Sequence, residues 1–187
     1  MRVIAGKARS MPLKSLKGRD VRPTTDRIKE TLFNILMPEI PGSRFLDLFA
    51  GAGAIGIEAL SRGAKDAWFI EKSKDACAII NANLEFTGLA EDAHVLGRDV
   101  SDGIMELNGK GAFDVIFMDP PYGKGYGPSI LSLLSRTDLA DEYTLVVLEE
   151  DLSDDFAEGD VISGFEITRI KQYRSNRHIF LKREADK

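Results

Sequence analysis

A glycine-rich turn between an apolar run and a helical segment places the strongest constraint on the fold. Residues 44–49 are mostly apolar, Gly51-Ala52-Gly53-Ala54-Ile55-Gly56 follows, and residues 54–62 have helical character. Between a strand and a helix, glycines at this spacing let the backbone approach a bound nucleotide closely. The pattern therefore predicts the first strand–turn–helix unit of an open α/β sheet.

Strand and helix signals then alternate along the chain. Further strands are predicted at 67–70, 93–96, 113–118 and 145–148, and helices at 73–86, 100–107 and 130–134. Such alternation implies a mostly parallel sheet with helices on both faces. The segments 161–170 and 178–181 are also strand-like, but the interval between them is too short for a helix. We therefore expect them to form an antiparallel pair at the sheet edge.

The segment before the glycine-rich turn has a different character. Residues 1–22 form a basic arm, with a short strand predicted near residues 2–5. A helix is expected to begin around Pro23-Thr24-Thr25-Asp26, where a threonine is the predicted N-cap. Its apolar face is formed by residues at helical spacing, namely Ile28, Leu32, Ile35 and Leu36.

Charge is distributed unevenly along the chain. The net charge is −5, but residues 1–30 contain nine Lys or Arg and three Asp or Glu, so they carry +6 and the remaining residues −11. A second basic stretch runs from Arg169 to Arg183 without an acidic residue. Local field steers an anionic ligand more than net charge does, so the two basic segments predict one positive face for nucleic acid. Two solvated charged segments are the alternative.

Composition excludes several classes of protein. The 187 residues suit one domain, and Cys77 is the only cysteine, which excludes an intrachain disulfide. No cluster of Cys and His has zinc spacing, so no metal site is predicted. The N-terminus lacks the apolar run of a signal peptide, and no stretch approaches the ~20 apolar residues that span a membrane. We expect a cytoplasmic protein without a membrane partner.

Three acidic residues at or after the carboxyl ends of the predicted strands indicate which cofactor the turn holds. Asp47 lies four residues before Gly51, Glu71 lies twenty residues after it, and Asp99 follows the third core strand. The Asp47 carboxylate would repel a pyrophosphate but attract the sulfonium and ammonium groups of S-adenosylmethionine. Glu71 is expected to accept from the ribose hydroxyls, and Asp99 from the adenine amine. The structural alternatives are a loop cap for Asp47, a surface acid for Glu71 and an N-cap for Asp99.

The apolar strand 113–118 runs directly into Asp119-Pro120-Pro121-Tyr122. Ligands of open parallel sheets bind beyond the carboxyl ends of the strands, so Asp119 is expected in the same cleft as the glycine-rich turn. Prolines fix φ and supply no N–H, which makes this loop stiff and leaves its carbonyls without a local donor. The alternative is a proline-rich turn whose acid caps a neighbouring segment and whose tyrosine packs.

The same tetrapeptide suits methylation of an exocyclic amine. If the Asp119 carboxylate and the Pro120 carbonyl each accept one N–H, the amine is held for in-line attack on the methyl group. Positive charge develops on nitrogen as the methyl group transfers, and Asp119 stabilises it. Tyr122 offers a flat face on which a flipped-out base can stack.

These segments together resemble a known family. The sequence Phe45-Leu46-Asp47-Leu48-Phe49-Ala50-Gly51-Ala52-Gly53, followed by Asp119-Pro120-Pro121-Tyr122, is similar to the Rossmann-like amino-methyltransferases. The chain also resembles the bacterial RsmD family over essentially its whole length. Members of this family make N2-methylguanine in small-subunit (16S) ribosomal RNA. The segments that carry this resemblance are 2–7, 22–27, 29–36 and 57–64.

The resemblance implies a Rossmann-like class I methyltransferase fold, which is α/β with a mostly parallel seven-stranded sheet, a C-terminal antiparallel edge and a small N-terminal extension. A single methyltransferase domain is expected, with residues 1–41 as the basic N-terminal arm plus helix and residues 42–187 as the catalytic core. Asp119, Pro120, Pro121 and Tyr122 are implied as catalytic. The implied contacts to S-adenosylmethionine come from Asp47, Gly51, Gly53, Glu71 and Asp99, with Arg27 near the cofactor carboxylate or the RNA.

Arg27 has a plainer alternative as an exposed helix charge. RNA contacts are expected from the basic segments at Arg2, Lys7, Arg9, Arg22, Arg174 and Arg177. The sequence departs from the family at Ser10 and at Arg174, where the family usually has glycine. Both positions lie in segments that are expected to face RNA.

Other functions are compatible with parts of this pattern. An N6-adenine methyltransferase acting on DNA or RNA can share the catalytic tetrapeptide, but a DNA enzyme normally needs a target-recognition region that this chain has little room for. A protein-glutamine methyltransferase typically has Asn where Asp119 stands. A nicotinamide-dependent oxidoreductase leaves Asp47 and Asp119 unexplained, and a non-catalytic RNA-binding module leaves the intact tetrapeptide unexplained. We expect small-subunit rRNA within an assembled ribosomal subunit as the partner, and no obligate protein partner.

Overall fold

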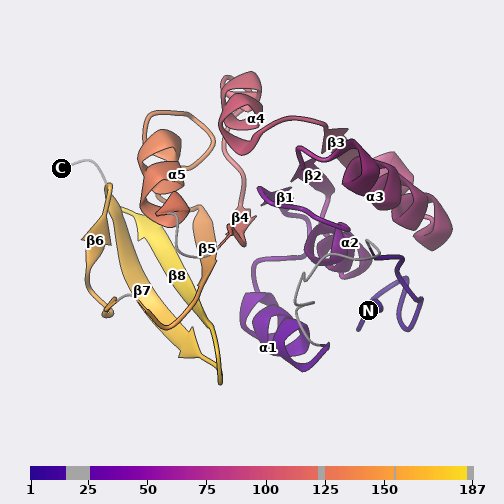
Figure 1. Ribbon diagram of the computed structural model, residues 1–187, viewed down its shortest axis with the longest axis horizontal. Helices are drawn as coiled ribbons and strands as arrows, with labels where there is room; N and C mark the ends of the chain where they lie inside the picture. Colours follow the sequence, from indigo (N-terminus) through magenta and orange to yellow (C-terminus); the bar gives the residue numbers. More distant parts are fainter. Residues whose placement is uncertain (16–25, 122–124, 154, 185–187) are drawn as a thin grey trace.

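A computed structural model describes residues 1–15, 26–121, 125–153 and 155–184. Its centre is one sheet with the strand order β3-β2-β1-β4-β5-β8-β7-β6 (Figure 1). The strands are β1 (Arg44–Asp47), β2 (Asp66–Ile70), β3 (Ala93–Leu96), β4 (Val115–Met118), β5 (Leu145–Glu150), β6 (Val161–Ile162), β7 (Phe165–Gln172) and β8 (Arg177–Arg183). β1 to β5 pair in parallel, whereas β5, β8, β7 and β6 pair antiparallel. The mostly parallel sheet and its antiparallel C-terminal edge are confirmed.

The predicted strand 161–170 is two strands joined by a tight turn. Ser163 and Gly164 have φ angles of 53° and 82°, and the residues that flank them pair across the hairpin. Positive φ at both central residues matches the twist of a two-residue hairpin. The prediction of a single strand over 161–170 was therefore wrong, although the Ser163-Gly164 dipeptide between apolar residues is a local turn signal. The sheet therefore has one two-residue strand, β6, beyond the seven that were expected.

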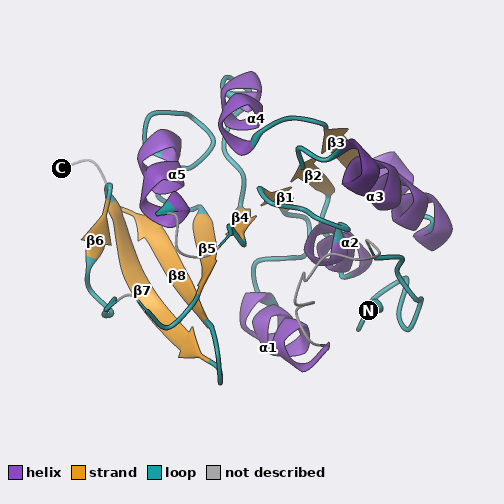
Figure 2. Ribbon diagram, in the orientation of Figure 1, coloured by secondary structure: helices purple, strands orange, loops and turns teal. Residues whose placement is uncertain are grey.

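Helices cover both faces of the sheet (Figure 2). They are α1 (Asp26–Leu36), α2 (Ala54–Ser61), α3 (Lys74–Thr87), α4 (Val100–Leu107) and α5 (Tyr126–Leu134), with a short 3-10 turn, η1 (Ala90–Asp92). Alternate residues of the central strands face opposite sides, as the strand period of two requires. Phe45 and Phe117 belong to the apolar cluster that includes α1, α2 and α3, whereas Leu46 and Ile116 pack with α4 and α5.

Helix boundaries follow their capping residues. The Ser73 hydroxyl accepts from the Ala76 N–H at the start of α3, and Gly88 ends that helix with a φ of 69°. The predicted segments 73–86 and 100–107 therefore agree with α3 and α4 to within a residue. The threonine N-cap predicted for α1 lies outside the described residues. Within the described ranges, no helix combines the length and apolarity needed to cross a membrane.

The N-terminal arm docks on α2 instead of forming the short strand predicted near residues 2–5. Among the described residues of the arm, one isolated antiparallel β-bridge joins Arg2 to Pro12. The N–H groups of Ile4 and Ala5 donate to the two carboxylate oxygens of Glu58, at 2.8 and 3.0 Å. These side-chain bonds satisfy backbone donors that a strand partner would otherwise take.

Glu58 is fully buried and also pairs with two basic side chains. The Lys29 ammonium lies 3.1 Å from one Glu58 oxygen, and the Arg62 Nε lies 2.7 Å from the other. Lys29 is 1% exposed and also donates to the Arg2 carbonyl at 2.6 Å. One carboxylate therefore joins the arm, α1 and α2.

Ser61 makes the second set of contacts to the arm. Its hydroxyl accepts from the Ala8 N–H and donates to the Ala5 carbonyl, and its own carbonyl accepts from the Lys7 N–H. Gly6 has a φ of 83°, and a Cβ there would lie 1.8 Å from the Ser61 carbonyl oxygen. Only glycine fits this close approach.

A third contact joins the arm to the glycine-rich turn. Asn83 on α3 is 1% exposed and exchanges two hydrogen bonds with the backbone of Lys14, at 2.8 and 3.1 Å. The same side-chain amide donates to the Ala52 carbonyl at 3.0 Å. The arm is thus bonded to the turn through a single buried side chain.

Replacing Glu58 by Ala should lower the free energy of unfolding by about 3–5 kcal/mol, because it leaves the buried Lys29 charge unpaired. Urea unfolding measures the change. The matched control is Glu85→Ala at an exposed position of α3, which should stay within about 0.5 kcal/mol of the parent. Equal effects of the two substitutions would show that Glu58 does not hold these segments together.

Candidate active site

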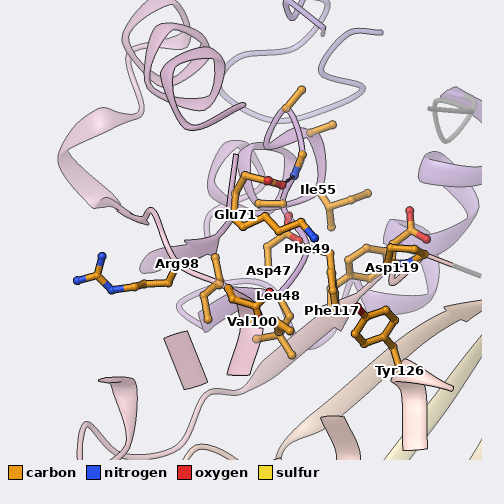
Figure 3. Close-up of a pocket in the computed structure, with 18 of the residues that line it drawn as sticks. Asp47, Leu48, Phe49, Ile55, Glu71, Arg98, Val100, Phe117, Asp119 and Tyr126 are labelled. Atoms are coloured by element: carbon orange, nitrogen blue, oxygen red, sulfur yellow. Dashed lines mark hydrogen bonds between the residues drawn. The ribbon is translucent and has the colours of Figure 1, made fainter. Parts of the chain in front are cut away.

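A cavity of about 520 Å³ opens at the carboxyl ends of the parallel strands (Figure 3). It lies where the strand order reverses between β1 and β4, which is the position where open α/β sheets bind ligands. Its lining includes residues from the ends of β1, β2 and β4 and from the glycine-rich turn. The predicted site residues among them are Asp47, Gly51, Glu71, Asp99, Asp119 and Pro121.

Two different structural constraints explain the three glycines of the turn. Gly51 and Gly53 have φ angles of 54° and 79°, which favour glycine. Gly56 has an ordinary φ, but a Cβ there would lie 2.3 Å from the Phe69 ring on β2. Because Gly56 has no side chain, α2 packs closely on the sheet, and the start of α2 lies beside the cavity.

Asp47 is buried at the carboxyl end of β1, with 1% of its surface exposed. Its Oδ2 accepts from the Gly56 N–H at 3.3 Å, so it does anchor α2, as the structural alternative requires. Burial raises the pKa of Asp47 to about 7, and the nearby Glu71 adds to the rise. Because Asp47 also lines the cavity, a cation bound there would favour its ionised form.

Glu71 holds the glycine-rich turn against the end of β2. Its two carboxylate oxygens accept from the Gly51 N–H at 2.9 Å and from the Ser73 N–H at 2.8 Å. A carboxylate oxygen has more than one acceptor position, so these bonds leave capacity for hydroxyl donors. Asp99 is exposed and caps α4 through the Ser101 N–H, and it lines the cavity as well.

Asp119 follows β4 directly and lies in an acidic part of the cavity. Burial raises its pKa well above the ordinary value, and Glu149, Asp47 and Glu150 raise it further, in that order. A site with this excess of negative charge favours a cationic ligand or a positive charge that develops during a reaction. Pro121 lines the cavity and Pro120 is buried, while Tyr122 lies outside the described residues.

An aromatic wall beside Asp119 is not predicted from the sequence. Phe49 and Tyr126 line the cavity, and their ring centres lie 6.0 Å apart in an edge-to-face arrangement. Figure 3 shows Phe117, Tyr126 and Asp119 along one side of the cavity. Tyr126 is the first residue of α5. The one sequence signal that could have indicated its role is that an aromatic residue occurs shortly after the Asp119–Tyr122 tetrapeptide.

Lys29 lines the cavity, whereas the predicted Arg27 is exposed on α1 and is not among the lining residues described. The buried face of α1 consists of Lys29, Leu32, Phe33 and Leu36. This is helical spacing, so the apolar periodicity could have shown that Lys29 points inward. The contact between Arg27 and a cofactor or RNA stays a prediction, as does the cofactor role of Gly53.

The residues predicted to bind RNA have different surroundings. Lys7, Arg9 and Arg174 are exposed, and Arg2 is exposed with its Nε 2.9 Å from Asp26. Arg177 is 7% exposed, and its guanidinium lies 5.1 Å from the centre of the Phe156 ring. Arg22 lies outside the described residues. The exposed members suit an RNA surface better than Arg177, and all of these RNA contacts stay predictions.

Comparison with known proteins identifies the relatives of the chain. The family model described as Conserved hypothetical protein 95 matches residues 1–182. Ribosomal RNA small subunit methyltransferase D of Haemophilus influenzae is 39% identical over 150 residues, which cover 80% of this chain and 78% of the relative. The protein of the same name from Escherichia coli K12 is 39% identical over 152 residues, with 80% and 75% covered. The chain belongs to the RsmD family.

Solved structures agree with this membership. The yhhF protein of Escherichia coli has a TM-score of 0.86 at 32% identity, and the match covers 100% of this RsmD-family chain and 99% of that chain. SMU.776, solved in complex with SAH, has a TM-score of 0.63 at 16% identity and is similar in fold; the match covers 82% of this chain and 49% of that one. The predicted Rossmann-like methyltransferase fold is confirmed.

Replacing Asp47 by Asn should change how the stability of this RsmD-family protein depends on pH. The folded-state pKa of Asp47 is about 7, against an ordinary value of 3.8, so the wild type loses stability as the pH rises through that window. The window spans about three pH units at about 1.4 kcal/mol each, so the variant should gain up to about 4 kcal/mol relative to the wild type across it.

Urea unfolding at several pH values between about 4 and about 7.5 measures this difference. Asp102→Asn, at an exposed position of α4, is the matched control and should follow the wild type at every pH. A stability difference between Asp47→Asn and wild type that does not change with pH would mean that Asp47 titrates as an ordinary carboxyl.

Proposed function

We propose that this RsmD-family protein transfers the methyl group of S-adenosylmethionine to the exocyclic N2 amine of a guanine in small-subunit (16S) rRNA. The observation that carries the proposal is the position of Asp119, which lines the same cavity as Asp47, Gly51 and Glu71. The names of the relatives support an rRNA substrate, and the SAH complex of SMU.776 supports the cofactor class.

The residues of the cavity fit S-adenosylmethionine. Its volume of about 520 Å³ lies in the usual range for cofactor sites. Asp47 supplies negative charge for the ammonium and sulfonium groups, and Glu71 supplies acceptors for the ribose hydroxyls. When bound, the cofactor supplies a methyl group on a positively charged sulfur. Asp99 remains the proposed acceptor for the adenine amine, in addition to its capping of α4.

Asp119 orients the target amine in this proposal. The guanine N2 amine is a weak nucleophile because its lone pair is delocalised into the ring. An N–H bond donated to the Asp119 carboxylate, and a second to the Pro120 carbonyl, fix the nitrogen and turn its lone pair toward the methyl group. Positive charge then develops on nitrogen next to a carboxylate that is already held among three other acids.

The experiment that tests the proposal follows labelled methyl from S-adenosylmethionine into small ribosomal subunits that lack the modification. Naked rRNA and duplex DNA are assayed in parallel, and the products are digested to nucleosides. Label in N2-methylguanosine supports the proposal, and a preference for subunits over naked rRNA supports the assembled particle as substrate. Label in N6-methyladenine instead would replace guanine by adenine as the target.

Asp119→Ala should lower turnover by at least about 100-fold, because it removes the acceptor that stabilises charge in the transition state. Cofactor affinity, measured by calorimetry, should change little, since Asp47 and Glu71 remain. The control is Asp102→Ala, an exposed acid of α4, which should keep full activity. Parallel losses of affinity and turnover in Asp119→Ala would assign Asp119 to cofactor binding instead.

Exchanging both Lys7 and Arg9 for Gln should weaken binding of small-subunit rRNA and make it less sensitive to salt. Each lost phosphate contact lowers the slope of log affinity against log salt by nearly one, so the double variant should lose about 1 to 2 in slope. Lys110→Gln, at an exposed position after α4, is the control for net charge. An unchanged slope in the double variant would place the RNA on another surface.

A further inference from the structure

A row of polar side chains continues from Asp119 across the sheet. The strand register pairs Met118 of β4 with Leu148 of β5, and Glu149 of β5 with His178 of β8. Residues two apart on a strand share a face, so Asp119, Glu149 and His178 follow Phe117, Val147 and Phe180 on the same side of the sheet. They occupy neighbouring positions at the cavity end of three adjacent strands.

Hydrogen bonds connect this row toward the antiparallel edge. His178 Nε2 lies 3.1 Å from Glu149 Oε2, and the Tyr173 hydroxyl lies 3.1 Å from His178 Nδ1. Asn176 donates to the other Glu149 oxygen. In one arrangement of protons that satisfies these contacts, Glu149 accepts from the Nε2–H of His178, and His178 Nδ1 accepts from the Tyr173 hydroxyl.

The row places two buried ionisable side chains, Glu149 and His178, where packing alone would not favour them. Glu149 is 4% exposed and His178 is fully buried. An apolar pair of similar volume would usually stabilise such a site at least as well. Glu149 also belongs to an acidic group, because the charges of Glu149, Asp47 and Glu150 all raise the pKa of Asp119. A carboxylate held at this point therefore has a role beyond packing.

We propose that Glu149 is a positioning residue for methyl transfer, which makes Asp119 the acceptor of the proton that the methylated amine releases. The inference rests on the proposed function. As the methyl group moves from sulfur to nitrogen, the C–S bond breaks, the C–N bond forms and the nitrogen becomes positively charged. An N–H bond then breaks, an O–H bond forms on Asp119, and the product amine leaves neutral. Asp119 later loses this proton to solvent.

Electrostatics explains why Glu149 suits this role. A proton acceptor works best when its pKa lies near the working pH, and an ordinary aspartate is too weak a base. Burial together with the charge of Glu149 raises the pKa of Asp119. His178 and Asn176 fix the position of the Glu149 carboxyl group by contacting both of its oxygens. On the far side, burial and Glu149 raise the pKa of Tyr173 to about 12, and the charge of Arg169 on β7 partly opposes this rise. That hydroxyl therefore stays protonated as a donor to His178.

The first test is the pH–rate profile of single-turnover methyl transfer to small ribosomal subunits, at saturating S-adenosylmethionine. The profile of Glu149→Gln should lose activity at a lower pH than wild type, with the acid limb displaced by about one pH unit or more. Glutamine keeps the size of the side chain and can bond Asn176 and the other tautomer of His178. Glu142→Gln, an exposed acid before β5, is the matched control and should leave the limb in place.

A second variant separates the charge of Glu149 from local packing. His178→Phe keeps a ring in place but removes the nitrogen that holds Glu149 Oε2 in position beside Asp119, so the acid limb should again move to lower pH. Thermal unfolding reports whether each variant is folded. If one fails to fold, the other carries the test, and Tyr173→Phe, which removes only the terminal hydroxyl, should give a smaller displacement in the same direction.

The final readout needs no methyl transfer. Carboxyl carbon NMR titration of the protein, with the Asp119 signal identified by its loss in Asp119→Asn, should show a lower midpoint for Asp119 in Glu149→Gln than in wild type. Unchanged midpoints and unchanged acid limbs would overturn the inference. A displaced midpoint in a protein that methylates no RNA would sustain the coupling of Glu149 to Asp119 but remove its role in methyl transfer, and the proposed function would fail separately.

Discussion

The buried Glu58 carboxylate is the interaction on which the arrangement of the N-terminal half depends. It accepts from two backbone N–H groups of the arm and pairs with Lys29 of α1 and Arg62 after α2. Burial disfavours the charged form of each side chain, so these ion pairs are stable only when all of the partners are in place. Since Lys29 also lines the cavity, the contact that seats the arm shapes the wall of the site.

Local signals made much of the fold predictable. Periodicity and capping residues gave the helices and parallel strands to within a few residues, because Ser73, Gly88 and Asp99 act over one helical turn. The turn at Ser163-Gly164 also has a local signal, a Ser-Gly dipeptide between apolar residues, which the single strand predicted over 161–170 overlooked. The docking of the arm was not predictable, because it depends on polar contacts between residues more than fifty positions apart. Such contacts leave no period in the sequence.

The candidate site was predictable to the extent that strand ends define it. Asp47 is the last residue of a strand, and Glu71, Asp99 and Asp119 come shortly after the ends of three others. Parallel strands bring their carboxyl ends to one edge, so these four side chains line one cavity. Tyr126 comes from the start of a helix, and Glu149 comes from the end of a strand whose apolar pattern stops before it. Neither has a spacing that distinguishes it from a surface residue. Only the fold shows that Tyr126 lines the cavity and that the register of the sheet places Glu149 next to Asp119.

The bonds of Asn83 have a consequence for how two ligands influence each other. The same amide holds Lys14 in the arm and the Ala52 carbonyl in the glycine-rich turn. A ligand that displaces the arm must therefore strain or release the turn, and a ligand that fixes the turn also favours one position of the arm. Thermodynamic linkage makes this coupling reciprocal: the factor by which the first ligand changes the affinity for the second equals the factor by which the second changes the affinity for the first.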